Sequence, residues 1–326
     1  MRLRQNPTEE EKTLGKVPKL ILQVAIAGAD TVPSQSPYIP LTADQQVEEC
    51  YKVWKAGAAA VHLHLREGKQ GKPSGDVKLW GELLTQVKKR CPGLIIGMTS
   101  GGAYGLTPAQ RLSVIKEYKP EIASFTPESV SNTLHHIVPR IKEWKYDWEK
   151  PYLLSAGTSA FVNTFDQIIL FAKTMREVGT KPEVELFSTS ALYNTRWLYR
   201  EGILEKPINI QFVLGALGGT GAYHSEVLHL QTEALRIFGE GNFNWSVIGV
   251  GYPRQYTLGA MAIGMFGHVR VGMEDNLYVR PGLLAKSNLD MVEDIKTIAT
   301  ICGRELATPD EAREILGLKG GDKVNF

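Results

Sequence analysis

The sequence has few cysteines, no long apolar run and almost no excess of either charge. Its cysteines, Cys50, Cys91 and Cys302, are odd in number and widely spaced, which argues against a disulfide framework or a CxxC zinc site and favours a reducing, cytoplasmic setting. No segment approaches the roughly 20 apolar residues that span a bilayer, and the polar start of the chain lacks the apolar stretch of a signal peptide. A net charge of +2 gives no electrostatic reason to expect nucleic acid or an anionic membrane as a partner.

Two nucleotide-binding signatures are also missing. The stretch LGALGGTGAYH has glycines at positions 215, 218, 219 and 221, which is the wrong spacing for the GxGxxG turn of a dinucleotide-binding sheet, and no P-loop occurs. A doubly wound open sheet is therefore only the structural alternative. The glycine-rich stretch could receive a phosphate or pantetheine group through its backbone N–H groups, or could simply be a flexible loop at a strand end.

Short apolar runs alternate with amphipathic helical stretches along the chain, a pattern that favours βα units and a parallel sheet. Thr42, Thr107 and Thr308 stand at helix starts, followed by proline, by Gln or Glu three residues on, or by both. Eight strands with helices between them predict an α/β fold, a (β/α)8 TIM barrel. The predicted strands are residues 20–28, 59–65, 93–100, 122–126, 183–189, 208–215, 245–251 and 268–274.

One segment interrupts this repeat. Residues 130–163 follow the fourth predicted strand and contain RIKEWKYDWEKP, and their last part, PYLLSAGTSAF (151–161), could form a ninth strand. We interpret 130–163 as an insertion that forms a hairpin or lid. The expected organisation is an N-terminal tail over residues 1–18 and a single barrel domain over residues 19–326.

Two of the seven histidines, His62 and His64, stand one residue apart in the apolar run AAAVHLHLRE. Residues two apart in a strand point to the same face, and in a barrel the active site gathers at the C-terminal ends of the strands. Two core histidines satisfied by polar neighbours are the alternative. The pair on one face favours a metal site, but catalytic zinc usually has three protein ligands, so a third is required.

The segment GHVRVGMEDN offers that third ligand. Arg270, Gly272 and Glu274 share one parity of the last predicted strand and can all face inward, with Gly272 leaving space for a metal or substrate. Asp275 follows at the junction of strand and loop, where it could act as a base. The alternatives are an interior salt bridge between Arg270 and Glu274, and turn formation by Asp275 and Asn276. The other histidines do not stand at predicted strand ends, which argues against a multi-histidine hydrolase site.

In their order along the chain these motifs resemble the β-keto acid cleavage enzymes, the family of the 3-keto-5-aminohexanoate cleavage enzyme. The resemblance covers most of the chain and rests on AIAGAD, AGAAAVHLHLRE, MTSGG, ASFTPESVSN, PEVELFSTS, FVLGALGG, WSVIGVG and GHVRVGMEDN. It implies a zinc-dependent barrel that catalyses a retro-Claisen-type exchange. A β-keto acid and acetyl-CoA become acetoacetate and the CoA thioester of the remaining acyl part. It also implies a homo-oligomer, a tetramer.

Carried over to the matching positions, the resemblance implies how the catalytic residues divide the work. Asp275 would be the general base, Arg270 would stabilise negative charge, and Glu185 would support Asp275. Glu183 shares the strand face of Glu185 and is the alternative to it. The implied zinc ligands are His62, His64 and Glu274.

The resemblance also implies where the substrate binds. Ser100 and Thr126 would hydrogen-bond its oxygens, with Ser124 as the alternative to Thr126 on the same strand face. Asp30, where the family often has Glu, would meet the variable end of the keto acid. Arg254 is a candidate for an anionic group of CoA or a carboxylate, or else a surface arginine. The expected substrate-binding set is Asp30, Ser100, Gly101, Thr126 and Arg254.

Two other functions stay open on the sequence. A metal-dependent hydrolase or aldolase-type lyase on a similar barrel would use zinc-bound water and would need no CoA. A non-catalytic barrel, in which the two histidines belong only to the core, would bind no metal. For a β-keto acid cleavage enzyme, the sequence leaves the identity of the keto acid undecided.

Overall fold

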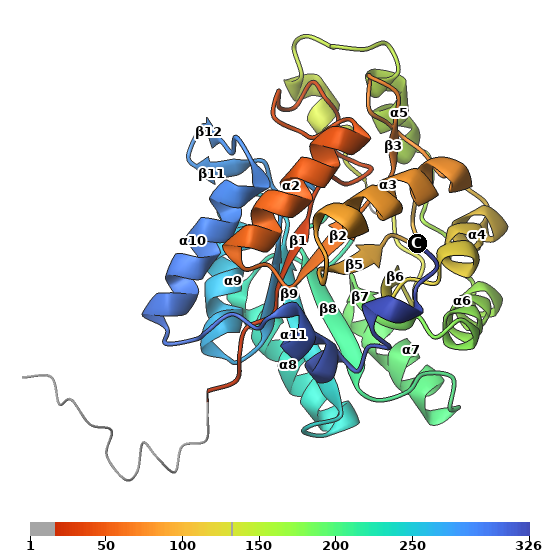
Figure 1. The fold of residues 1–326 in the computed structure, drawn as a ribbon, viewed down its shortest axis with the longest axis vertical. Coiled ribbons are helices and arrows are strands. Elements are labelled where there is room, and N and C mark those ends of the chain that lie inside the picture. The colour runs from red at the N-terminus through yellow and green to blue at the C-terminus, as the bar shows by residue number, and fades with distance from the viewer. Residues whose placement is uncertain (1–16, 132) are drawn as a thin grey trace, which may run out of the picture.

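The structure is a computed structural model that describes residues 17–131 and 133–326. Parallel strands close into an eight-stranded barrel in the order β1-β10-β9-β8-β7-β6-β5-β2, with helices around its outside (Figure 1). This confirms the (β/α)8 barrel and excludes the open sheet, and each predicted strand is present. The tail expected over residues 1–18 falls almost entirely outside the described residues. The barrel strands are β1 (Leu22–Ala25), β2 (Ala60–Leu63), β5 (Ile95–Met98), β6 (Ile122–Phe125), β7 (Lys181–Leu186), β8 (Ile208–Leu214), β9 (Phe243–Gly249) and β10 (His268–Val271).

Local capping signals start several of the outer helices where the sequence predicts them. The Thr42 side chain accepts from the N–H of Gln45, whose own side chain accepts from the N–H of Thr42, and the same reciprocal pair begins the helices after Thr107 and Thr308. Such a cap stabilises a helix by about 1 kcal/mol. The helices are α2 (Ala43–Ala56), α3 (Val77–Arg90), α4 (Pro108–Tyr118), α5 (Glu149–Ala156), α6 (Phe165–Glu177), α7 (Thr189–Arg200), α8 (His224–Phe238), α9 (Arg254–Gly264), α10 (Asn288–Ile301) and α11 (Pro309–Leu316).

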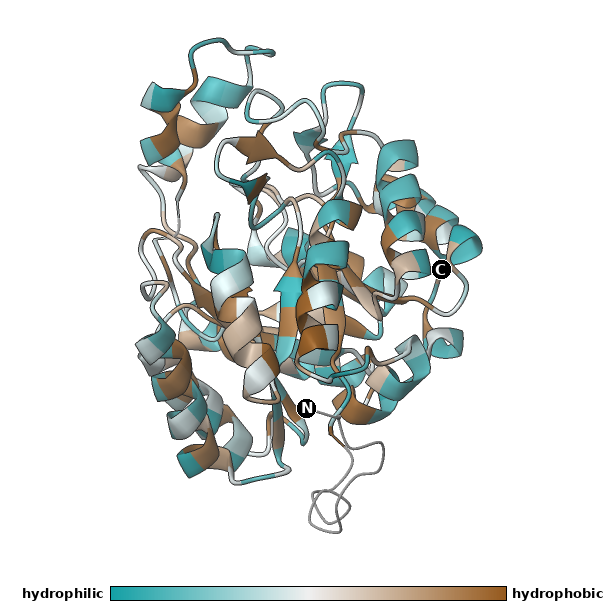
Figure 2. Ribbon diagram, turned by 90° about the vertical axis from the view of Figure 1, so that its left-hand side faces the viewer, coloured by the Kyte–Doolittle hydropathy of each residue, from teal (hydrophilic) through white to brown (hydrophobic). Residues whose placement is uncertain are grey.

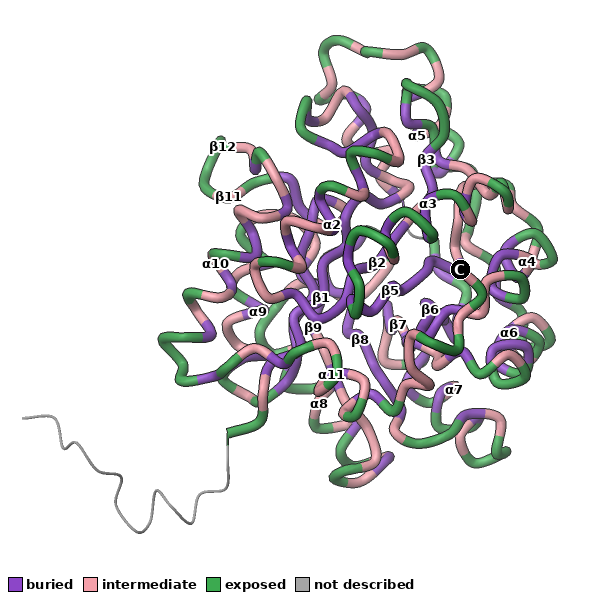
Figure 3. The backbone as a smooth tube through the Cα atoms, viewed as in Figure 1, coloured by how far each residue is buried: buried purple, intermediate pink, exposed green. Residues whose placement is uncertain are grey.

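The core lies between the barrel and the inner faces of these helices. On α3, Trp80, Leu83, Leu84 and Val87 are buried at helical spacing, while the polar residues between them face outward. Buried residues are concentrated in the barrel strands (Figure 3), and the helices around them carry both hydrophilic and hydrophobic residues (Figure 2). No helix within residues 17–131 and 133–326 is long and apolar enough to cross a membrane. Two small antiparallel sheets, β3 (Arg66–Glu67) with β4 (Lys72–Pro73) and β11 (Tyr278–Arg280) with β12 (Leu283–Leu284), complete the fold.

The 130–163 insertion leaves the barrel after β6 and returns before α6, but the ninth strand predicted over 151–161 is wrong. Val130 and Phe161 pair in a single antiparallel bridge at its base, and between them lie the 3-10 helix η1 (His135–Arg140) and the helix α5. Leu153 and Ala156 are buried at helical spacing, and Pro151 falls in the first turn, where a missing N–H costs nothing. In Figure 1 this insertion stands above the barrel.

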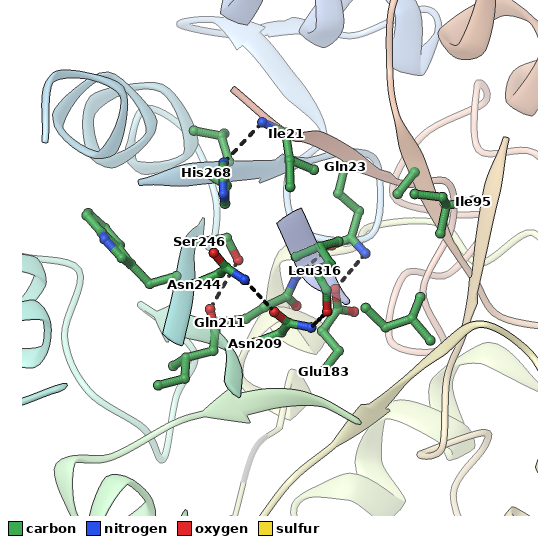
Figure 4. Close-up of a pocket in the computed structure, with 15 residues that line it drawn as sticks. Ile21, Gln23, Ile95, Glu183, Asn209, Gln211, Asn244, Ser246, His268 and Leu316 are labelled. Carbon is green, nitrogen blue, oxygen red and sulfur yellow. Dashed lines mark hydrogen bonds between the residues drawn. The ribbon is translucent and has the colours of Figure 1, made fainter. Parts of the chain in front are cut away.

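A layer of polar side chains crosses the barrel interior near the N-terminal ends of the strands (Figure 4). Gln23 Nε2 donates to Glu183 Oε1 at 2.9 Å, and Gln211 Nε2 donates to Gln23 Oε1 at 2.6 Å. Below them, Asn209 Nδ2 donates to the carbonyl of Leu316 at 2.9 Å, so that the end of α11 closes the barrel from underneath. The layer borders a cavity of about 30 Å³, room for about two waters. The opposite, C-terminal end of the barrel is left for a site.

His268 also lines this cavity. Because its imidazole is buried, we expect the protein to lose stability in acid. Its Nδ1 accepts the N–H of Ile21 at 3.1 Å, and burial, with Arg304 nearby, lowers its pKa from 6.5 to about 3. Below about pH 6.5 the unfolded chain takes up a proton here that the folded chain refuses, so stability falls by roughly 1.4 kcal/mol per pH unit until about pH 3. We expect the free energy of unfolding, measured with urea, to fall between pH 7 and pH 5 by roughly 2 kcal/mol less in His268→Gln than in the wild type. Glutamine keeps an acceptor for the N–H of Ile21. Equal losses in both proteins would contradict this assignment.

Candidate active site

The C-terminal end of the barrel brings the three predicted metal ligands together. His62 stands on β2, His64 is the first residue after that strand, and Glu274 lies in the turn after β10. One potential ligand atom from each lies within 4.8 Å of the others. Nε2 of His64 is 3.5 Å and Nε2 of His62 is 3.7 Å from Oε1 of Glu274. Residues from opposite ends of the chain meet here because β2 and β10 both flank β1.

The chemistry of these side chains fits a divalent metal ion. Nδ1 of both histidines and Oε2 of Glu274 are buried and have no hydrogen-bond partner within residues 17–131 and 133–326. Burial lowers the pKa of His62 well below its usual value, which leaves a neutral imidazole. Burial alone would raise the pKa of Glu274, but Arg270, His64 and His62 hold it well below its usual range. Imidazoles with one carboxylate are a donor set of catalytic zinc sites.

The last barrel strand ends sooner than the alternation of inward-facing and outward-facing residues in its sequence predicts. β10 stops at Val271, and Gly272 has a φ of +144°, so Glu274 and Asp275 stand in a turn and not on a strand. The N–H of Asp275 donates to the carbonyl of Gly272 at 3.1 Å, as the turn alternative expected. A side chain at position 272 would collide with the backbone of Ala25. The space that this glycine leaves is therefore filled by β1, and not by a metal or substrate.

Arg270 is the centre of a buried ion cluster. Its side chain is only 3% exposed, and its Nε and Nη2 donate to the two carboxylate oxygens of Asp275 at 3.0 and 3.1 Å. Nη2 also donates to Glu274 Oε1 at 2.5 Å, and Nη1 donates to Glu185 Oε1 at 3.3 Å. The salt bridge expected as an alternative is thus present, but it is one of three. Glu185, from β7, is linked to Asp275 through this guanidinium.

The carboxylates of the cluster have unusual proton affinities. Burial raises the pKa of Asp275 to about 6 and that of Glu185 to about 7, against the opposing effect of Arg270. Burial also raises the pKa of Glu183 to about 7, but this residue bonds Gln23 in the polar layer, and its neighbour Glu185 is the one that contacts Arg270. A carboxylate whose pKa lies near neutrality can both take and return a proton.

A model of the beta-keto acid cleavage enzyme family matches residues 19–318. The chain belongs to this family. It is 36% identical over 308 residues to a 3,5-dioxohexanoate:acetyl-CoA acetone transferase of Paraburkholderia graminis. That alignment covers 94% of this chain and 98% of the relative. A 3-keto-5-aminohexanoate cleavage enzyme of Fusobacterium nucleatum is 36% identical over 301 residues, 92% and 98% of the two chains. The solved apo structure of ObcA aligns with a TM-score of 0.67 and 22% identity over 87% of this chain and 66% of that one, a likeness of fold alone.

Arg66, the last residue of HLHLR, holds the loop after β1 in place. Its Nη2 donates to the carbonyl oxygens of Gly28 and Thr31, and its Nη1 donates to that of Gly71 at 2.8 Å. Gly28 packs so closely on Glu274 that a Cβ at position 28 would collide with the Glu274 side chain. Arg66 and Gly28 therefore place this loop beside the candidate metal ligands, a role that the motif alone did not indicate.

Three of the predicted substrate-binding residues follow the C-terminal ends of β5 and β6. The N–H of Ser100 donates to the Ser124 hydroxyl at 2.9 Å, and the N–H of Gly101 donates to Thr99 Oγ1 at 2.9 Å. The Ser124 hydroxyl thus joins the two strand ends as an acceptor, and the choice between Ser124 and Thr126 as the substrate contact stays a prediction.

A pair of residues that the sequence did not single out holds these two strand ends in place. Arg111, on α4, donates from Nε to the Ser100 carbonyl at 2.7 Å and from Nη1 to Asn163 Oδ1 at 3.0 Å. Asn163 in turn donates from Nδ2 to the Thr126 carbonyl at 3.1 Å. The sequence signal for Arg111 is its charge on the inward face of an amphipathic helix. That signal can be recognised only when the inward face of the helix is known.

Asp30 and Arg254 have different surroundings. Asp30 is half-buried after β1, and burial raises its pKa, with Tyr104, His64 and Glu274 as electrostatic neighbours. Arg254 is exposed at the start of α9, where its Nη1 lies 3.5 Å from the Val250 carbonyl. The structure thus places Asp30 near the candidate metal ligands and leaves Arg254 on the surface.

The glycine-rich stretch lies beside Arg254 and uses part of its backbone internally. A Cβ on Gly215 would lie 3.4 Å from Cδ of Arg254. The N–H of Gly215 donates to the Thr220 carbonyl at 2.9 Å, and that of Thr220 donates to the Phe187 carbonyl at 2.7 Å. At least these N–H groups are therefore engaged, which makes the stretch a more ordered loop than the flexible alternative expected.

Proposed function

We propose that this protein is a metal-dependent enzyme that exchanges the acyl part of a β-keto acid with acetyl-CoA, giving acetoacetate and an acyl-CoA. The observation that carries the proposal is the buried Arg270 cluster, in which one guanidinium binds Asp275, Glu185 and Glu274 beside the histidine pair. The Paraburkholderia relative is an acetyl-CoA-dependent transferase by name, which supports acetyl-CoA as the co-substrate. We propose zinc as the ion because two imidazoles and one carboxylate leave an open fourth position in a tetrahedral site.

In this proposal Asp275 is the general base and Arg270 the fixed positive charge. Burial opposes that charge, but three carboxylates raise the pKa of Arg270 well above its usual value, so it stays protonated. Asp275 would take a proton from the carbon between the carboxylate and keto groups, and Arg270 would stabilise the enolate charge that develops. A bound divalent ion would supply Lewis acidity at the keto oxygen. Glu185 would hold the guanidinium in position, and Ser100, Gly101, Thr126 and Asp30 would bind the keto acid, with Arg254 available to an anionic group of CoA at the rim.

A cytoplasmic homo-oligomer, a tetramer, is part of the same proposal. The cysteines are free thiols, which suits a reducing compartment. Phe165 on α6 and Trp197 on α7 pack edge to face with ring centroids 5.7 Å apart, and they are 54% and 39% exposed. Exposed aromatic surface of this kind suits contact with another subunit.

The decisive experiment incubates the purified protein with acetyl-CoA and a panel of β-keto acids. We expect acetoacetate and one acyl-CoA in equal amounts for at least one acid, and loss of the reaction when a chelator removes the metal. Keto acid consumed without acetyl-CoA would instead support the hydrolase or lyase alternative. A protein that is purified without metal and turns over none of the acids would support the non-catalytic barrel.

A further inference from the structure

An aromatic cluster joins the 130–163 insertion to the loop after β5. The rings of Tyr104, in that loop, and Tyr152, on α5, lie 4.8 Å apart between centroids. Trp148, at the start of α5, packs edge to face on Tyr152 at 5.7 Å. Two segments that follow neighbouring barrel strands therefore share one aromatic wall.

The helix α5 is anchored on the loop that carries Asp30. Glu149 Oε2 accepts the N–H of Ser34 at 2.7 Å, and its Oε1 accepts the N–H of Tyr146 at 2.8 Å. Leu153 packs with Val32 in the same small apolar cluster. The insertion is thus held against the β1 loop, whose Gly28 contacts Glu274.

Asp30 connects this wall to the candidate metal site. Its carboxylate interacts with the Tyr104 hydroxyl and has His64 and Glu274 as electrostatic neighbours. Arg66 has both Tyr152 and Glu274 as neighbours. A keto acid whose carboxylate and keto group lie at the histidine pair would therefore extend its remaining chain towards the wall.

The wall contains polar atoms that lack protein partners. Oη of Tyr152 and Nε1 of Trp148 are buried, and neither meets a partner in hydrogen-bonding geometry within the described part of the chain. The Tyr104 hydroxyl, by contrast, interacts with the Asp30 carboxylate. Buried polar groups in native proteins are nearly always paired, because an unpaired one costs the desolvation of that group. Two such groups in one wall, one of them on a tyrosine that neighbours the Asp30 carboxylate, point to a ligand that supplies their partners.

We propose that the insertion provides the specificity wall for the acyl part, and that Tyr152 with Tyr104 and Asp30 selects β-keto acids whose far end carries a hydroxyl or ammonium group. Either group can donate to the Asp30 carboxylate and also pair with a tyrosine hydroxyl. A plain alkyl end would leave these polar atoms unpaired. This inference rests on the proposed function, since it concerns the acyl end of that substrate.

The test compares six-carbon β-keto acids that differ only at C5, where they carry hydrogen, a hydroxyl or an ammonium group. We expect the wild type to show at least a roughly tenfold higher kcat/KM for one polar acid than for the alkyl acid. Tyr152→Phe is expected to lose roughly tenfold on the preferred acid and to leave the alkyl acid unchanged. Tyr146→Phe removes a hydroxyl from the same insertion outside the cluster, and should change neither. Whichever polar acid is preferred identifies the group.

Calorimetric titration of the protein with the same acids separates this inference from the proposed function. A preference for a polar acid in binding, lost in Tyr152→Phe, supports the wall even when no acyl-CoA is formed. A wild type that takes the alkyl acid equally well overturns the inference, and so does a Tyr152→Phe variant that weakens all three acids alike. Failure to bind any of the acids overturns both.

Discussion

Replacing Asp275 by asparagine is expected to lower kcat by about 10²–10⁴-fold while the bound metal is retained. Asparagine has the same shape and can still accept from Arg270, whose Nε and Nη2 now reach the two carboxylate oxygens. It cannot take a proton at neutral pH. Steady-state rates with the preferred keto acid, together with metal analysis of the same samples, measure the two effects separately.

Hydrogen–deuterium exchange at the carbon between the carboxylate and keto groups, in the absence of acetyl-CoA, tests the role of Asp275 directly. The wild type should catalyse this exchange and Asp275→Asn should not, because only the proton transfer is observed. Exchange at the wild-type rate in the variant would contradict the assignment of the base. The role would then pass to Glu185, whose pKa of about 7 also suits proton transfer.

Replacing Glu274 by glutamine is expected to weaken zinc binding by at least about 100-fold, because loss of an outer-shell partner alone typically costs 10- to 100-fold. Glutamine removes the negative charge that lies 3.5 Å from Nε2 of His64 and 3.7 Å from that of His62. Competition with a coloured chelator measures the affinity, and turnover should fall with occupancy.

Glu183→Gln is the matched control for this change, since Glu183 is also buried inside the barrel but belongs to the polar layer with Gln23. It should bind zinc as the wild type does. Wild-type affinity in Glu274→Gln would remove this residue from the ligand set. Equal weakening in both variants would indicate a general disturbance of the barrel.

The barrel could be predicted from the sequence because its signals are local. Thr42 and Gln45 are three residues apart and form their cap within one helical turn. His62 and His64 share a face through the two-residue period of a single strand, whatever the rest of the chain does. Each of the eight apolar runs likewise predicts its own strand from local sequence alone.

The features that the sequence did not predict depend on distant contacts. The backbone departs from the strand conformation at Gly272, where Ala25 of β1 occupies the space beside it. The alternation of residues along β10 therefore predicted a longer strand than the one that ends at Val271. Residues 151–161 contain a short apolar run that suits strand or helix alike. The outcome follows from Leu153 packing with Val32 and from Glu149 binding the N–H of Ser34, two contacts with the loop after β1.

The single bridge between Val130 and Phe161 has an evolutionary consequence. The insertion leaves and rejoins the barrel at two paired residues, with N–H to carbonyl distances of 3.0 and 2.8 Å. The entropy of closing a loop rises only slowly with its length, so descendants of this protein could change the length of the segment at little cost to the barrel wherever the contacts of Glu149, Leu153 and Asn163 are kept. The residues on the strand ends would then be inherited unchanged while the segment above them diversified.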